Sequence, residues 1–115
     1  MTSASDLCSF LDSSPVNFLA VHTAAGCLEA AGFKALSMRE PWTFDAGDRR
    51  YVTVNDSALF AFVVGEGDAA APFHIIASHS DSPCFRIKPE PEIVCDGGIV
   101  KLNTEVYGGP ILYTW

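Results

Sequence analysis

A short polar segment, His79-Ser80-Asp81, carries the residue types in this chain that are best suited to metal chemistry. It follows the apolar run 73–77, which predicts a buried strand, and ligands of α/β proteins gather at the carboxyl ends of strands. An imidazole binds a metal through one ring nitrogen, while a nearby carboxylate can hold the other nitrogen. A catalytic zinc normally takes about three protein ligands and a water. His79 with Asp81 therefore indicates one part of a metal site and not a whole one.

The other polar candidates have simpler interpretations. A His-x-Asp spacing taken alone is more often an exposed pair than a ligand set, so both interpretations stay open on these residues. His22 is predicted on a helix face, and His74 is predicted to pack within a strand. Glu105 lies on a strand near a glycine turn, where a structural or interface role is favoured over catalysis. The acidic residues of Gly- and Pro-rich loops are interpreted as solvated charges; they are Glu66, Asp68, Glu90, Glu92 and Asp96.

Composition bounds the class of protein. The 115 residues are 49% hydrophobic and 18% charged, which suits one small domain with a packed core. A net charge of −7 argues against nucleic acid as a partner, because phosphate binding needs clustered Lys and Arg. No apolar stretch approaches the roughly 20 residues that cross a bilayer, so no membrane partner is expected. We expect a cytoplasmic protein whose four cysteines, without C-x-x-C spacing, are reduced and partly buried thiols.

Two helices are predicted near the start of the chain. The first is predicted over residues 2–11, with Ser3 or Ser5 as its cap. Ser14 suits the N-cap and Pro15 the first position of a second helix. That helix covers residues 16–31, where apolar positions repeat at helical spacing, and Gly32 suits its C-terminal end.

Strands are predicted further along. Residues 34–47 are expected to be irregular, and strands over 50–54 and 58–64 flank a turn at 55–57, which predicts a hairpin. Residues 73–78 are predicted to form a third strand, buried on both faces.

A second hairpin is predicted after the polar segment. A short strand over 85–88 is expected to stop at Pro89 and Pro91. Residues 93–95 and 99–106 then flank an Asp-Gly-Gly turn. Together the elements predict an α/β fold with helices packed on a mixed β-sheet.

Several stretches in register resemble one known family. The run Ile76-Ala77-Ser78-His79-Ser80-Asp81-Ser82-Pro83-Cys84-Phe85-Arg86-Ile87-Lys88 is similar to the histidine segment of the aspartyl aminopeptidase family of zinc metallopeptidases. Further similar stretches are Phe10-Leu11 with Ser14-Pro15, Ala31-Gly32-Phe33, the Trp42 region, Val54-Asn55 with Ser57, and Ala61-Phe62. Near the end, Glu105-Val106-Tyr107-Gly108-Gly109-Pro110 stands where the family usually has Glu-Thr-Tyr-Gly-Gly-Gly.

The resemblance implies a site and an activity. His79 matches the family's N-terminal zinc ligand, and Asp81 matches the catalytic-site acid two positions later, which supports that histidine. The family uses a two-metal zinc centre to remove N-terminal residues, preferably Asp or Glu, from peptides, and its members form homo-oligomers. Residues 1–84 would be the N-terminal part of a zinc-peptidase-like catalytic domain, and residues 85–115 the start of an inserted β-rich oligomerisation domain.

The remaining metal ligands and the general base of the family match no position in this sequence. We therefore expect the N-terminal portion of such an aminopeptidase, inactive as this chain alone, with an apolar tail at 111–115 that lacks its packing partners. The alternative is a non-catalytic truncated remnant that acts as a binding or assembly module.

Overall fold

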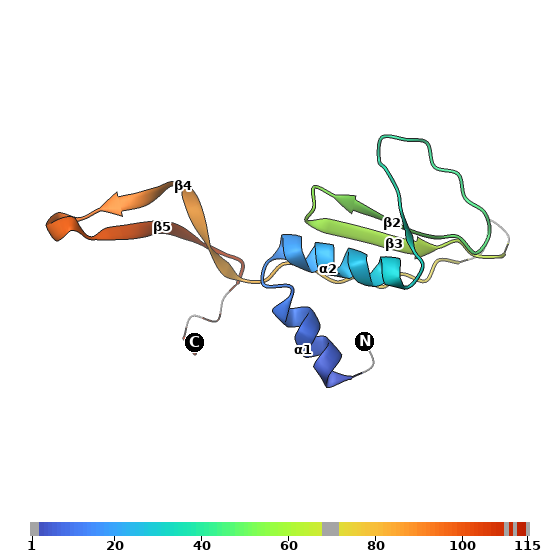
Figure 1. Ribbon diagram of the computed structural model, residues 1–115, viewed down its shortest axis with the longest axis horizontal. Helices are drawn as coiled ribbons and strands as arrows, with labels where there is room; N and C mark the ends of the chain where they lie inside the picture. Colours follow the sequence, from blue (N-terminus) through green and yellow to red (C-terminus); the bar gives the residue numbers. More distant parts are fainter. Residues whose placement is uncertain (1–2, 68–71, 110, 112, 115) are drawn as a thin grey trace. The chain divides into compact units, whose positions relative to one another are not determined.

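The computed structural model describes residues 3–67, 72–109, 111, 113 and 114. The chain divides into two compact units, Met1–Asp81 and Ser82–Trp115. The first unit holds helices α1 (Ala4–Asp12) and α2 (Asn17–Ala30) and strands β1 (Lys34–Ala35), β2 (Arg49–Val54) and β3 (Ala58–Val63). The second holds strand β4 (Cys84–Val94), the short 3-10 helix η1 (Asp96–Gly98) and strand β5 (Val100–Tyr107), as Figure 1 shows. No helix among the described residues is long and apolar enough to cross a membrane.

Both predicted helices are confirmed. Helix α1 begins with a capping box, in which the Ser3 hydroxyl accepts from the Asp6 N–H and the Asp6 carboxylate accepts from the Ser3 N–H. Helix α2 ends in a Schellman motif: Gly32 has φ +84°, and the Phe33 N–H donates to the Leu28 carbonyl at 2.9 Å.

The predicted start of α2 is wrong by two residues. Val16, in extended conformation, is the N-cap and has no side-chain capping bond, and Pro15 lies in the bend before it. The Ser14 hydroxyl is buried without a hydrogen-bond partner, so it does not cap this helix. Tertiary packing of α2, and not a capping residue, therefore sets where this helix begins.

A three-stranded mixed sheet, in the order β1-β2-β3, confirms the predicted α/β class. β1 pairs in parallel with β2, so the expectation of irregular chain over 34–47 is wrong at its first two residues. A strand of two residues carries too little pattern to be recognised in a sequence. β2 and β3 form the predicted antiparallel hairpin.

The loop between β1 and β2 is tied down by its aromatic side chains. The Trp42 indole N–H donates to the Ser37 carbonyl at 2.7 Å. The ring centroids of Phe44 and Phe62 lie 5.2 Å apart in an edge-to-face contact, which joins the loop to β3.

The core of the first unit lies between α2 and the sheet. Helix α2 contacts all three strands, and Val21, Tyr51 and Val52 are the buried hydrophobic residues of the described chain. The Tyr51 hydroxyl donates to the Glu29 carboxylate at 2.5 Å, which ties β2 to the last turn of α2.

The predicted third strand is not formed. Residues 72–83 carry no strand or helix assignment, and Phe73, Ile75 and Ile76 are 90%, 81% and 101% exposed. The composition of this run is that of a buried strand, but burial needs neighbouring strands on which to pair and pack. Among the described residues no strand pairs with it.

The second unit is a β-hairpin longer than predicted. β4 continues through Pro89 and Pro91, and its pairing with β5 shifts register between Ile87 and Glu92. Prolines cannot donate ladder hydrogen bonds, so the strand bulges where they occur. The Asn103 amide donates to the Glu90 carbonyl at 3.2 Å inside this bulge, which satisfies an acceptor that the ladder leaves unpaired.

Candidate functional site

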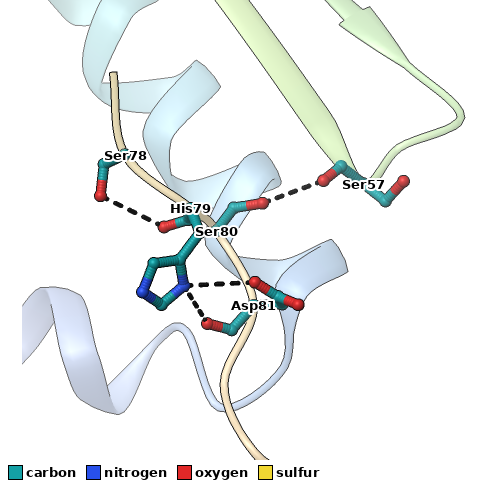
Figure 2. A network of polar contacts seen from close by, with 5 residues as sticks. All are labelled: Ser57, Ser78, His79, Ser80 and Asp81. Atoms are coloured by element: carbon teal, nitrogen blue, oxygen red, sulfur yellow. Dashed lines mark hydrogen bonds and ion pairs between the residues drawn. The ribbon is translucent and has the colours of Figure 1, made fainter. Parts of the chain in front are cut away.

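The His79 ring folds back onto the residue two positions later. Its Nδ1 lies 2.8 Å from the Asp81 carbonyl oxygen and 3.2 Å from the Asp81 carboxylate oxygen Oδ1. Both contacts are drawn as dashed lines in Figure 2. A carbonyl can only accept, so Nδ1 must carry the proton and donate it. The neutral ring then has its lone pair on Nε2. This is the tautomer in which a histidine binds a metal through Nε2 while its other nitrogen is held.

Asp81 contributes more through its backbone than the sequence indicates. The sequence predicts that its carboxylate supports the histidine, and the shorter contact comes from its carbonyl. The carbonyl fixes the tautomer, and the carboxylate adds negative charge beside the ring. The assignment of Asp81 to the catalytic site stays a prediction.

Ser80 lies between the two and is held by another element. Its hydroxyl donates to the Ser57 carbonyl at 3.0 Å, next to the turn that joins β2 and β3. The side chains of His79 and Asp81 contact each other, whereas that of Ser80 contacts the β2–β3 hairpin. Ser80 therefore attaches the segment to the hairpin, while His79 and Asp81 form the candidate ligand pair.

The segment is open to solvent. The side chain of His79 is 81% exposed and that of Asp81 is 39% exposed. An exposed pair of this kind contributes little to stability, so the contact orients the ring and does not hold the fold together. Nε2 is accessible to a ligand.

The donor set fits one position of a zinc centre. An imidazole with a held Nδ1 is a normal zinc ligand. In the part of the chain that the structure describes, no group of three or more His, Cys, Asp or Glu side chains is placed to hold a metal ion. His79 is the one metal ligand that the sequence predicts, and that role stays a prediction.

The remaining candidate residues do not gather around His79. His22 lies on α2, His74 is exposed in the unpaired segment, and Glu105 pairs across the hairpin with Arg86. Asp68 lies outside the described residues. The four cysteines are free, as predicted; the expected partial burial holds for Cys95, which is half-buried, and is wrong for Cys8, Cys27 and Cys84, which are exposed.

One feature of the first unit was not expected from the sequence. A hollow of about 260 Å³ lies between α2 and the strands, lined by Phe18, Val21, Leu36 and Tyr51 among others.

The pKa of the Tyr51 phenol is raised, first by its hydrogen bond to Glu29 and then by burial. Sequence patterns carry no signal for this pair, because the two residues lie 22 positions apart.

The known proteins that this chain resembles belong to one family. The sequence profile of the family described as Aminopeptidase I zinc metalloprotease (M18) matches residues 10–115. A probable M18 family aminopeptidase 2 of Clostridium novyi (strain NT) is 50% identical over 113 residues, which are 97% of this chain and 26% of the relative. A protein of the same name from Stutzerimonas stutzeri (strain A1501) is 46% identical over 110 residues, 95% of this chain and 25% of that protein.

A solved structure shows the same fold. A chain in the cryo-EM structure of the Ape4 and Nbr1 complex superposes with a TM-score of 0.90 at 35% sequence identity. The match covers 97% of this chain and 22% of that chain. This chain thus spans about a quarter of the length of the curated relatives that it matches. The profile match over nearly all of its residues shows that the chain belongs to the M18 family of zinc metalloproteases, to which the similarity of its histidine segment to aspartyl aminopeptidases pointed.

Proposed function

We propose that this chain supplies one histidine ligand and its supporting acid to the metal centre of a zinc-dependent aminopeptidase. That enzyme removes N-terminal residues, preferably Asp or Glu, from peptides. The observation that carries the proposal is the hydrogen bond from His79 Nδ1 to the Asp81 carbonyl, which leaves Nε2 free and accessible. Membership of a zinc metalloprotease family supports it.

The role of each residue follows from its chemistry. His79 binds zinc through Nε2, and the Asp81 carbonyl and carboxylate hold the ring from the other side. A two-metal zinc centre, when bound, polarises the peptide carbonyl and lowers the pKa of a water. Removal of a supporting carboxylate such as that of Asp81 typically costs about 10–100-fold in metal affinity or activity.

The chain alone is proposed to be inactive. One imidazole and its supporting acid make an open, weak site, and no further ligand group is present among the described residues. The purified chain should therefore show no turnover of Asp- or Glu-substrates. Chelator-sensitive hydrolysis by this chain alone would contradict that part of the proposal.

A second role, in assembly, rests on the β4–β5 hairpin. Its apolar side chains Phe85, Ile87 and Leu102 are 60%, 61% and 64% exposed, as expected for a surface that another chain covers. We propose that the complete protein is a cytoplasmic homo-oligomer that uses this hairpin as a contact. The non-catalytic alternative keeps this contact without the zinc centre.

A chimera tests the catalytic proposal. In the Clostridium novyi relative, the matching quarter is replaced by this chain, either unchanged or with His79→Ala or His74→Ala. His74 is the matched control, because it is an exposed histidine of the same segment. We expect His79→Ala to lower the bound zinc measured by mass spectrometry and to abolish hydrolysis of an Asp-substrate, while His74→Ala changes neither. Full zinc content and activity in the His79→Ala chimera would refute the proposal.

A further inference from the structure

Ser80 makes a polar contact between the histidine segment and the β2–β3 hairpin of the sheet. The hydrogen bonds of His79 reach only its neighbours Ser78 and Asp81, whereas the bond from the Ser80 hydroxyl to the Ser57 carbonyl spans 23 residues. The apolar side chains before it do not hold the segment in place, because Phe73 and Ile76 are almost fully exposed. The orientation of His79 therefore depends on how firmly Ser80 is attached.

The acceptor is well placed for this task. Ser57 closes the turn between β2 and β3, and its own N–H donates to the Val54 carbonyl at 3.2 Å. The two residues before it, Asn55 and Asp56, have φ of 51° and 54°. Asn and Asp tolerate this left-handed conformation better than other non-glycine residues, so the turn holds one geometry. The Ser57 carbonyl is thus fixed by a paired hairpin.

We propose that Ser80 is a positioning residue for the metal ligand: its hydroxyl, bonded to the Ser57 carbonyl, holds the backbone of residues 79–81 so that His79 donates Nδ1–H to Asp81 and presents Nε2. The proposal rests on the function proposed above, and it adds the residue through which the sheet fixes the orientation of the His79 imidazole ring. Ser80 lies between His79 and Asp81 in the chain, and its side chain is bonded to the hairpin.

The tautomer of His79 reports this effect directly. A free neutral imidazole prefers its proton on Nε2, and the Asp81 carbonyl reverses that preference only while residues 79–81 keep their conformation. Nitrogen-15 NMR of the whole 115-residue chain at pH 8 distinguishes the two tautomers of each histidine. If Ser80 only stabilised the fold of the unit, its substitution would not change the tautomer ratio of His79 while leaving those of the other histidines unchanged.

Three variants test the proposal. Ser80→Ala removes the donor, Ser80→Thr keeps it, and Ser57→Ala is the matched control, because it retains the backbone carbonyl that accepts. We expect Ser80→Ala to lower the ratio of Nδ1–H to Nε2–H tautomer at His79 by a factor on the order of 2 to 10. Ser80→Thr should restore most of the ratio, and Ser57→Ala should leave it unchanged. An unchanged ratio in Ser80→Ala, or an equal loss in Ser57→Ala, would overturn the proposal.

The metal is tested separately, with zinc chloride as the probe. Suppose that Ser80→Ala changes the tautomer ratio, but that zinc shifts the ring-nitrogen NMR signals of His79 neither in the unchanged chain nor in the chimera. The positioning contact then stands and the zinc function fails. Suppose instead that zinc shifts the ring-nitrogen signals of His79 equally in the unchanged chain and in Ser80→Ala, and that both have the same tautomer ratio. The zinc function then stands and the positioning role is refuted.

Discussion

The hydrogen bond between Tyr51 and Glu29 joins β2 to α2, and it can be removed without changing the packing of the ring. Tyr51 is 6% exposed, and its hydroxyl donates to Glu29 Oε1 at 2.5 Å. Tyr51→Phe keeps the buried ring and removes only that donor. The substitution therefore measures the bond without opening a cavity.

The expected cost follows from the geometry. Hydrogen bonds to charged groups contribute about 1.5–3 kcal/mol when both partners are desolvated. Glu29 is exposed, so its carboxylate is rehydrated by water once the hydroxyl is gone. We therefore expect Tyr51→Phe to lower the free energy of unfolding of the first unit by ~1 kcal/mol at pH 7.

The cost also depends on pH with a definite sign. The pKa of Tyr51 is raised above its usual value of 10.0, first by the hydrogen bond to Glu29, then by burial and by the negative charge of Glu29. A raised pKa in the folded state means that the stabilisation is fully present below pH 10 and is lost as pH rises through the folded pKa. The difference between the unchanged chain and Tyr51→Phe should then shrink above pH 10.

Urea unfolding followed by Trp42 fluorescence provides the assay, in a Trp115→Phe background so that the signal comes from the first unit. Tyr113→Phe is the matched control, since Tyr113 is fully exposed, and it should change the unfolding midpoint negligibly. Equal midpoints for Tyr51→Phe and Tyr113→Phe, or a difference that stays constant from pH 8 to pH 11, would show the reasoning to be wrong.

Two further perturbations probe the first unit. The Arg50 guanidinium bonds Asp48 at 2.9 Å and lowers the pKa of that carboxyl below 3.8, so this contact stabilises above that pH and is lost as pH falls through the folded pKa. Arg50→Gln should raise the pKa of Asp48 in an NMR titration, and an unmoved pKa would rule the contact out as the cause. Ile75→Ser and Ile76→Ser should change the free energy of unfolding by less than about 0.5 kcal/mol, against ~2 kcal/mol for Val52→Ala in the core. A larger loss at either isoleucine would mean that this run is buried.

Elements with local signals were predictable. A serine before the first helix and the glycine after the second gave the caps of α1 and α2, because capping bonds join residues only three to five positions apart. The Asn55-Asp56 turn predicted the β2–β3 hairpin for the same reason. His79 and Asp81 lie two positions apart, so the sequence also indicated their pairing, although not which oxygen of Asp81 makes the shorter contact.

Contacts between distant residues were not predictable. β1 is defined by its pairing with β2, and the bond from Ser80 to Ser57 joins two segments whose sequences give no sign of each other. The prolines of β4 predicted a stop, but a bulge and the side chain of Asn103 accommodate them. In each case a partner elsewhere in the chain changed the outcome.

By itself the sequence determined the family, the helices and the two hairpins, and it indicated His79 as a candidate metal ligand, since these depend on residue types at short spacing. Only the tertiary structure decided the tautomer of that histidine, its attachment to the sheet through Ser80, and the exposure of residues 73–77. The physical reason is that an apolar pattern records a preference for burial, while burial itself requires a second surface, and hydrogen bonds across the fold require two backbones to meet.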